Sequence, residues 1–425
     1  MYINRAIDLS KILKNKSLFL FGPKQTGKTT YIKKQLTIKS VLEYNLFDSN
    51  IFFNLSNDPG LIRKTVEAYD YKNCLIVIDQ IQELPILLNE VQLMIDERNI
   101  KFLLTGSSAR KLKRNSCNLL GGRARWRNFN ALSYYELLKN EENFDLNLIL
   151  NNSLLPSIYF SDEPEEDLDS YTSLYVIQEI KAEGLTRKLL DFSRFLKVAS
   201  LSNSQEINYS KIANDAQTNN QAVMQWVQVL EDTLLGFFLE PFKKLETRKS
   251  ITRKKFYFFD TGVARALKAG KKVTSSLDTD FDEYFEQLII LEIKKYLDYN
   301  KPRTKINYIR TTTGFEIDCL LNEEIAIEIK SSNNITARHY KNLKLLKASY
   351  VKRKIIVCTT ENYYKEKDIE IMPYKIFINQ LWNNEIVLNL YYYHILKTYL
   401  LTGEYSTGSP FIDKLNLVQL NIVIY

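Results

Sequence analysis

Near its N-terminus the chain reads Ser17-Leu-Phe-Leu-Phe-Gly22-Pro-Lys-Gln-Thr-Gly27-Lys28-Thr29-Thr30. This pattern predicts a short apolar strand, a loop that begins and ends in glycine, and a helix that begins at Lys28. The spacing Gly-x-x-x-x-Gly-Lys-Thr is typical of a phosphate-binding loop, in which successive backbone N–H groups point inward and bind an anion. The positive end of the following helix strengthens such a site. The alternative is a glycine-rich turn between strand and helix that binds nothing.

The loop therefore predicts a binding site for ATP and Mg²⁺. Lys28 is expected to reach the β- and γ-phosphates, and the Thr29 hydroxyl is expected to ligate Mg²⁺. The residues expected to contact the nucleotide are Gly22, Pro23, Lys24, Gln25, Thr26, Gly27, Lys28, Thr29 and Thr30.

A second apolar run, from Cys74 to Asp79, predicts a buried parallel strand that ends in a carboxylate. Ligands bind at the carboxyl edge of open α/β sheets, so Asp79 is expected to help hold Mg²⁺. Gln80 follows, at a position where many ATPases of this type carry a glutamate that orients the attacking water. An amide can hydrogen-bond this water but cannot accept its proton. Nucleotide binding is therefore expected, whereas hydrolysis is left open.

Two further segments carry candidate nucleotide contacts. The apolar run that starts at Lys101 predicts another buried strand, and Thr105 and Ser107 at its end suit either sensing of the γ-phosphate or simple capping of the strand. The segment Leu120-Gly-Gly-Arg123 places an arginine on a loop. Arg123 is expected either to contact phosphate, in cis or across a subunit interface, or to be an ordinary surface residue.

The composition is that of a soluble globular protein, with 45% hydrophobic and 25% charged residues. The net charge of +8 permits a nucleic-acid partner without requiring one. The cysteines are scattered singly, which disfavours a zinc site or a disulfide framework. The N-terminus lacks a signal-peptide pattern, and the longest apolar run, from Ile386 to Leu401, contains polar residues. A cytoplasmic protein without a membrane span is therefore expected.

The order of these motifs resembles that of one group, the prokaryotic AAA-type ATPases that carry a winged helix and a C-terminal restriction-endonuclease-like domain. The resemblance extends from about Tyr2 to Leu381. It rests on the phosphate loop, on Ile78-Asp79-Gln80-Ile-Gln82, and on Leu104-Thr-Gly-Ser-Ser-Ala109 with the later Leu-Gly-Gly-Arg123. Gln80 stands where the group usually has glutamate, and Lys24 stands where the loop more often has arginine.

The resemblance implies an α/β fold with several domains. An AAA-type P-loop NTPase domain with a parallel sheet would occupy residues 1–140 and a helical linker or lid residues 141–190. A winged helix would follow at 191–270 and a nuclease-like α/β domain at 275–385. The tail, 386–425, has no assignment.

The middle of the chain has a helix-turn-helix pattern. Residues 207–216 and 220–232 show helical spacing on either side of a polar turn, and strands are expected at 237–242 and 255–259. The functional interpretation is a DNA-binding winged helix whose wing follows phosphates, while polar side chains on the second helix reach base edges. The alternative is a small domain that packs its neighbours together. The polar side chains are Asn220, Gln221, Gln225 and Gln228, and the basic wing comprises Lys243, Lys244, Arg248, Lys249, Arg253, Lys254 and Lys255.

The C-terminal half contains a pattern of carboxylates on apolar elements. Glu286 lies on a predicted helix, 281–299, on the same face as several apolar residues, and a buried carboxylate without a partner is costly. Two alternating strands at 316–321 and 325–330 flank a three-residue turn. Pairing Leu321 with Ile325 places Asp318 opposite Glu328, with Lys330 on the same face.

Like charges this close repel unless a cation lies between them, so Asp318 and Glu328, with Glu286, are expected to bind Mg²⁺. Lys330 would orient or polarise an attacking water. The Asp…Glu-x-Lys arrangement resembles the metal-dependent nuclease core of restriction-endonuclease-type enzymes, which implies phosphodiester cleavage. The alternatives are an ordinary hairpin with an exposed charged face, or a nuclease fold reused as an inert binding domain.

Two functions are consistent with these patterns. The first is an ATP-dependent DNA-binding protein in which the nucleotide state controls a metal-dependent nuclease. The second is a switch in which Gln80 blocks hydrolysis and the C-terminal domain binds a nucleic acid or a protein without cutting. A scaffold in a defence or toxin-like system is a third. The expected partner is DNA, with a homo-oligomer or another protein as alternatives.

Overall fold

A computed structural model describes residues 2–38, 40–110, 112, 120–140, 145–176, 189–243, 252–300, 303–346 and 351–387. Met1–Asn379 form one compact unit and Gln380–Tyr425 a second, and each is considered by itself. The predicted tail lies almost wholly outside the described residues. No helix in these ranges combines the length and the apolar character needed to cross a membrane.

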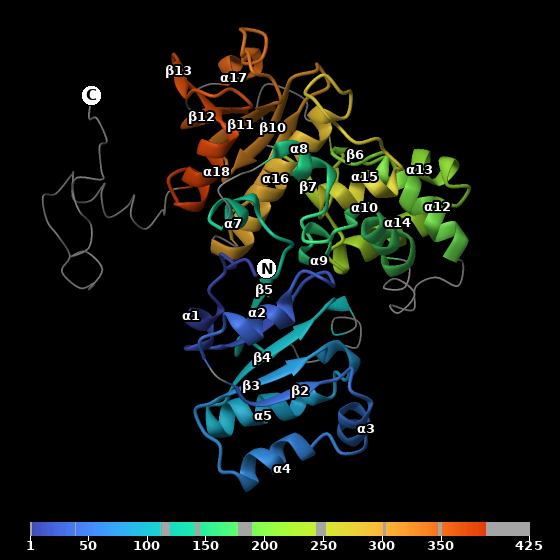
Figure 1. Ribbon diagram of the computed structural model, residues 1–425, viewed down its shortest axis with the longest axis vertical. Coiled ribbons are helices and arrows are strands. Elements are labelled where there is room, and N and C mark those ends of the chain that lie inside the picture. Colours follow the sequence, from blue (N-terminus) through green and yellow to red (C-terminus); the bar gives the residue numbers. More distant parts are fainter. Residues whose placement is uncertain are drawn as a thin grey trace, which may run out of the picture. The chain divides into compact units, whose positions relative to one another are not determined.

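The N-terminal domain is built on a five-stranded sheet in the order β2-β3-β4-β1-β5, and every neighbouring pair is parallel. This confirms the predicted parallel sheet. Strands β1 and β3 are apolar along nearly their whole length because helices cover both faces (Figure 1). The elements are α1 (Leu9–Leu13), β1 (Ser17–Phe21), α2 (Lys28–Lys34), β2 (Ser40–Asn45), α3 (Ser49–Asn57), α4 (Leu61–Ala68), β3 (Leu75–Asp79), η1 (Ile81–Glu83), α5 (Leu87–Arg98), β4 (Lys101–Gly106), β5 (Ala124–Asn128) and α7 (Tyr134–Leu138).

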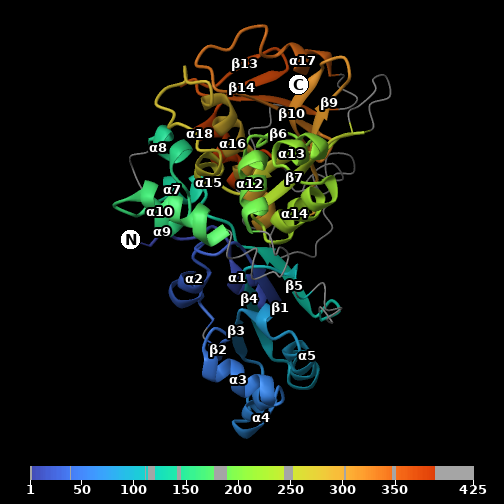
Figure 2. The same ribbon diagram turned by 90° about the vertical axis from the view of Figure 1, so that its right-hand side faces the viewer.

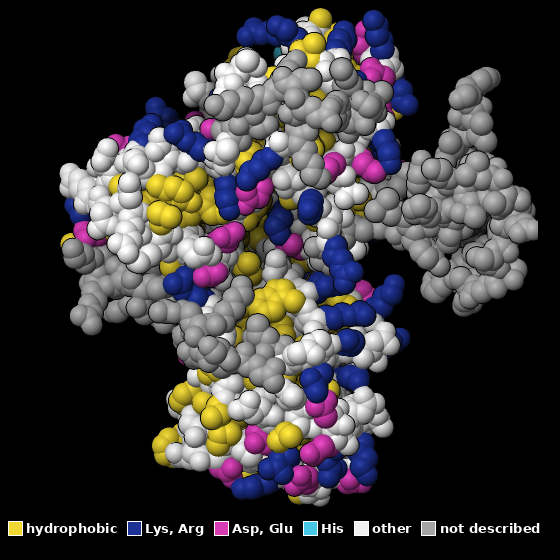
Figure 3. All heavy atoms as spheres, turned by 180° about the vertical axis from the view of Figure 1, so that it is seen from behind, with side chains coloured by type: hydrophobic (Ala, Val, Ile, Leu, Met, Phe, Trp, Pro, Cys, Tyr) yellow, Lys and Arg dark blue, Asp and Glu magenta, His cyan; other side chains and the backbone are white. Residues whose placement is uncertain are grey.

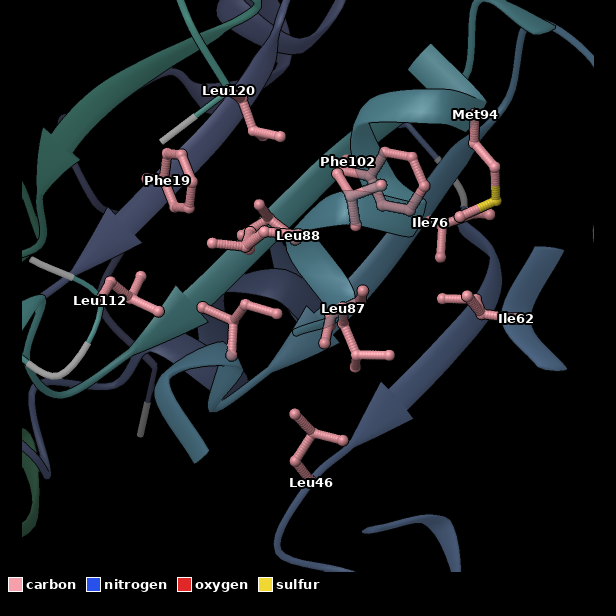
Figure 4. Close-up of a cluster of buried hydrophobic side chains, with 14 of the residues drawn as sticks. Phe19, Leu46, Ile62, Ile76, Leu87, Leu88, Met94, Phe102, Leu112 and Leu120 are labelled. Atoms are coloured by element: carbon pink, nitrogen blue, oxygen red, sulfur yellow. The ribbon is translucent and has the colours of Figure 1, made fainter. Parts of the chain in front are cut away.

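The main core of this domain lies between the sheet and α5. Leu87, Leu88 and Met94 of the helix pack toward Phe102 and Ile76 of the strands (Figure 4). Helix α1 packs against β1 and β4. With both faces covered, the carboxyl edge of the sheet is where a ligand can bind, and this edge carries the phosphate loop.

The middle region is mainly helical and contributes strands β6, β7 and β8 to the next sheet. Its elements are α8 (Leu146–Asn151), α9 (Pro156–Tyr159), α10 (Pro164–Ser170), the π-helical turn η2 (Tyr171–Tyr175), α12 (Leu189–Ser200), β6 (Gln205–Glu206), α13 (Tyr209–Asp215), α14 (Asn220–Asp232), β7 (Gly236–Pro241), β8 (Lys255–Phe258) and α15 (Thr261–Leu267). The predicted helix pair and strand pair are present as α13, α14, β7 and β8.

The C-terminal region contains a nine-stranded sheet in the order β13-β14-β12-β11-β10-β9-β7-β8-β6. The strands predicted as a wing therefore continue the sheet of the C-terminal region, since β7 pairs with β9. Helix α16 packs against β11 (Figures 1 and 2). The remaining elements are α16 (Phe281–Asn300), β9 (Ile306–Arg310), β10 (Glu316–Leu321), β11 (Ile325–Lys330), α17 (Lys341–Leu345), β12 (Arg353–Cys358), β13 (Tyr364–Glu366), β14 (Ile369–Pro373) and α18 (Tyr374–Trp382).

The hairpin register predicted from the alternation is confirmed. Cys319 pairs with Ile327 and Leu321 with Ile325. The alternative of an ordinary hairpin with an exposed charged face is not what the structure has, because Asp318 and Glu328 are buried as well as the apolar face. Helix α16 packs against β11 and covers this face. The lysines Lys255 and Lys330, described below, balance the charge that is buried there.

Candidate functional site

A pocket of about 660 Å³ lies at the carboxyl edge of the N-terminal sheet. Most of the residues predicted to contact nucleotide line it, together with residues from β2, from the chain before α1 and from α9. The lining residues are Tyr2, Ile3, Arg5, Lys24, Gln25, Gly27, Lys28, Thr29, Thr30, Asn45, Phe47, Asp79, Gln80, Leu132, Pro156, Ser157 and Phe160.

Two side chains of the phosphate loop donate hydrogen bonds to carbonyl oxygens of the same loop. The Lys28 ammonium donates to the carbonyl oxygens of Gly22, at 2.7 Å, and Pro23, at 2.9 Å. The buried Thr26 hydroxyl donates to the Pro23 carbonyl at 2.9 Å. Gly27 has a φ of +90°, a conformation that side chains disfavour, and α2 begins at the next residue. The loop thus holds a lysine charge at the floor of the pocket.

The pocket brings Asp79 beside the loop. The Thr29 hydroxyl lies 3.5 Å from Asp79 Oδ2, and the Thr105 hydroxyl donates to Asp79 Oδ1. A hydroxyl and a carboxylate oxygen at this separation are ligands that suit Mg²⁺ beside a triphosphate. The Thr105 side chain is fully buried. Its hydroxyl contacts Asp79 and orients this carboxylate.

Gln80 is held by a second glutamine. Its backbone has a φ of +63°, and its Oε1 accepts a hydrogen bond from Gln82 Nε2 at 2.6 Å. The same Gln82 nitrogen lies 3.4 Å from the Ser107 hydroxyl. Gly106 makes room for this amide, since a Cβ there would lie 2.1 Å from Gln82 Oε1. Gln82 was not predicted as a site residue, although it stands at the end of the motif Ile78-Asp79-Gln80-Ile-Gln82.

Arg5 is a further pocket residue that was not predicted from the sequence. Its guanidinium is buried and donates to the Thr26 carbonyl of the loop at 2.8 Å. It also pairs with Glu136, with Arg5 Nε 3.1 Å from Glu136 Oε2. Ser157 of α9 supports the loop from another side, donating to Gln25 Oε1 at 2.8 Å. These contacts join residues far apart in the chain, so no local pattern predicts them.

Arg123 does not lie at the pocket. It immediately precedes β5, which pairs in parallel with β1 so that Ala124 lies beside Ser17, the first residue of that strand. The phosphate loop follows the other end of β1, a distance of roughly 15 Å along the strand. The Arg123 side chain pairs instead with Asp96, with Nε 2.6 Å from Oδ1. Within this chain it is not among the residues that line the pocket.

The predicted carboxylate pair and its lysine do come together in the C-terminal region. Lys330 Nζ lies 2.8 Å from Glu328 Oε2 and 3.2 Å from Asp318 Oδ2, which also accepts the Ile329 amide at 2.8 Å. Burial raises the pKa of Asp318, but the Lys330 and Lys255 ammonium groups outweigh it and hold this pKa below its ordinary value. Burial and the Asp318 charge raise the pKa of Glu328 well above its ordinary value.

Glu286 lies in the same cluster, with a partner that was not predicted. Lys255 Nζ lies 3.3 Å from Glu286 Oε1 and 3.0 Å from Glu316 Oε1. The Tyr257 hydroxyl donates to Glu286 Oε1 at 2.7 Å. Burial raises the pKa of Glu286, although Lys255 opposes this shift. We call Glu286, Glu316, Asp318, Glu328, Lys255 and Lys330 the carboxylate cluster.

The carboxylate cluster does not have the arrangement expected of a metal site. Among the described residues, no group of three or more His, Cys, Asp or Glu side chains is placed to hold a metal ion. Two lysine ammonium groups lie between the carboxylates instead. The predicted Mg²⁺ ligands Glu286, Asp318 and Glu328 therefore come together, but around lysines.

The predicted DNA-binding face is only partly described. Asn220, Gln221, Gln225 and Gln228 of α14 are exposed, as expected. Lys243 and Arg253 are exposed too, whereas residues 244–251 of the wing lie outside the described ranges. Lys254 pairs with Glu240 at 2.5 Å, and Lys255, predicted as part of the basic wing, is buried in the carboxylate cluster.

Comparison with known families assigns the N-terminal region. Residues 145–275 match a domain of unknown function (DUF8612), and residues 281–377 match another (DUF4143). No curated protein matches the chain. Residues 14–138 match a family described as an AAA domain, a class that implies nucleotide binding and commonly uses Mg²⁺. This match and the geometry of the loop identify the N-terminal region as an AAA-type P-loop domain.

Proposed function

We propose that this protein is an ATP-binding switch with slow hydrolysis, whose C-terminal region binds a nucleic acid or a protein without cutting it. Lys28 would bind the β- and γ-phosphates, and Thr29 with Asp79 would hold Mg²⁺, which would neutralise phosphate charge. The observation that supports slow turnover most directly is the Gln82–Gln80 hydrogen bond at 2.6 Å. This bond fixes the Gln80 amide directly after Asp79, at the position where an ionised base would accept the proton of the attacking water.

The first prediction concerns turnover. Replacing Gln80 with glutamate is expected to raise the rate of phosphate release by about 10–100-fold, because a carboxylate can accept a proton from the attacking water. The substitution should be tolerated, since Gln82 Nε2 can donate to a carboxylate oxygen as it does to the amide. Steady-state phosphate release with saturating ATP and Mg²⁺ measures the effect.

The matched control for this prediction is Glu83→Gln, three residues further along and outside the set of pocket-lining residues. Its rate should equal that of the unaltered chain. Brisk release from the unaltered chain, or no gain in Gln80→Glu, would contradict the proposed block on hydrolysis.

DNA is the partner that we propose first. The exposed polar face of α14, together with the exposed Lys243 and Arg253 of the predicted wing, supports this choice. Lysine and arginine side chains are also spread over much of the face shown in Figure 3. A DNA contact should weaken steeply with salt, because phosphate binding releases counterions. Anisotropy of labelled duplex at several salt concentrations, with and without ATP, tests both binding and its coupling to nucleotide; a flat salt response would favour a protein partner.

Metal-dependent cleavage of DNA is the second candidate function. It is favoured by Asp318, Glu328 and Lys330 on adjacent strands, and by Glu328 Oε1, a buried oxygen that no donor reaches within the described part of the chain. Incubation of DNA with Mg²⁺ and either the unaltered chain or Lys330→Ala distinguishes the candidates. The switch predicts no products from either protein; products that disappear in Lys330→Ala would establish the nuclease.

A further inference from the structure

Lys255 occupies an unusual position for a lysine on a segment first interpreted as a DNA-binding wing. Its side chain is only 5% exposed and lies within 3.3 Å of Glu286 and 3.0 Å of Glu316. Asp318 is close enough to contribute to the electrostatic field at its ammonium group. The alternation along β8 places Tyr257 on the same face, where its hydroxyl donates to Glu286.

The residues around Lys255 come from several separate elements. Glu286 lies on α16, Glu316 and Asp318 lie on β10, and Lys255 itself lies on β8. Carboxylates gathered from different elements at such distances repel unless a positive charge lies among them. Lys255 supplies that charge on one side of the cluster, as Lys330 does between Asp318 and Glu328.

We propose that the Lys255 ammonium group takes the place of a divalent cation in the carboxylate cluster. The cluster then holds β8, β10 and α16 together without metal, as a built-in ion-pair network. This inference refines the non-cutting part of the proposed function and is independent of the nucleotide pocket. It also accounts for the absence, among the described side chains, of any group arranged to ligate a metal.

A Mn²⁺ titration followed by the EPR signal of the free ion tests this inference. The whole chain is used without nucleotide and with Asp79→Asn, so that the P-loop pocket loses its carboxylate ligand. With Lys255 intact we expect no stoichiometric Mn²⁺ site at millimolar metal. Lys255→Met, which has a slightly shorter unbranched side chain without a charge, is expected to gain one site. The gain in affinity should be about a hundredfold or more, since unit charges about 4 Å apart interact strongly at an effective dielectric constant of about 20.

Two variants make the result specific. Lys255→Arg keeps the charge and should bind no Mn²⁺, and adding Asp318→Asn to Lys255→Met should remove the new site. A stoichiometric Mn²⁺ site in the chain with Lys255 intact, abolished by Asp318→Asn, would overturn the inference. So would a folded Lys255→Met that gains no site.

A second measurement decides the matter if Lys255→Met does not fold. The thermal unfolding of the chain with Lys255 intact should be unchanged by Mn²⁺ or Mg²⁺, because ligands stabilise only the states that bind them. A rise in melting temperature with metal that Asp318→Asn abolishes would contradict a lysine-filled cluster. All of these metal measurements are made without nucleotide. A result that contradicts the lysine-filled cluster therefore does not affect the ATP-binding proposal, and a failure to bind ATP does not affect the metal measurements.

Discussion

Replacing Lys28 with alanine is expected to lower the affinity for ATP about a hundredfold or more. The Gly22 and Pro23 carbonyls hold the buried Lys28 ammonium in the pocket, where it would meet the phosphates of a bound nucleotide. Hydrogen bonds to charged groups contribute about 1.5–3 kcal/mol each, and Lys28 can make more than one. Titration of a fluorescent ATP analogue with Mg²⁺ present measures the loss.

The control for this change is Lys33→Ala, which removes an exposed lysine from the same helix. Its ATP affinity should match that of the unaltered chain. Lys28→Ala also leaves the Gly22 and Pro23 carbonyls without their donor, so its melting temperature must be compared with that of the unaltered chain. A folded Lys28→Ala that binds ATP normally would remove the nucleotide site from the proposed function.

Replacing Arg5 with methionine is expected to destabilise the protein by about 3–5 kcal/mol, the usual cost of leaving a buried charge without its partner. The side chains of Arg5 and Glu136 are 3% and 1% exposed. Burial opposes the charge on Arg5, but Glu136 more than compensates and raises the pKa of the guanidinium. The same guanidinium also contacts Tyr299 of α16 at 3.1 Å, so it joins the phosphate loop to the C-terminal region.

A double-mutant cycle separates the ion pair from general damage. Arg5→Met with Glu136→Gln should recover part of the stability lost in either single variant, because neither charge is then left alone. The exposed Arg125 on β5 is the matched control, and Arg125→Met should change stability by no more than about 0.5 kcal/mol. Urea unfolding at neutral pH provides the values; strictly additive losses would show that the pair does not act as a unit.

The same Arg5→Met variant tests the link to the nucleotide. Loss of the hydrogen bond to the Thr26 carbonyl is expected to loosen the loop and weaken ATP binding by about tenfold, the effect of roughly one net hydrogen bond. ATP binding should in turn raise the melting temperature less in this variant than in the unaltered chain. An unchanged ATP affinity would mean that Arg5 is purely structural.

Short-range patterns predicted the main features of both sites. The spacing from Gly22 to Thr29 predicted a loop most of whose residues line the pocket. The apolar run ending at Asp79 predicted a strand that places this carboxylate beside Thr29. Alternation of apolar and polar residues predicted the pairing of Leu321 with Ile325. These features depend on neighbours within one or two elements, where periodicity determines which face each side chain occupies.

Long-range contacts decided what these sites can do. Gln82 reaches Gln80 because Gly106, on another strand, leaves space for its amide. Arg123 follows a plausible loop motif but lies at the far end of β1, because the parallel pairing of β5 sets its position. Lys255 belongs to a basic run that suggested solvent exposure, yet β8 places it among carboxylates of α16 and β10.

By itself, then, the sequence determined the presence of an AAA-type P-loop domain, the edge of its sheet where the pocket lies, and the pairing that brings Asp318, Glu328 and Lys330 together. Only the tertiary structure decided which side chains neutralise those charges and which residues join the loop to the rest of the chain. The physical reason is that a buried charge takes its partner from whatever is packed beside it in space, and for Arg5 and Lys255 those partners lie many residues away along the chain.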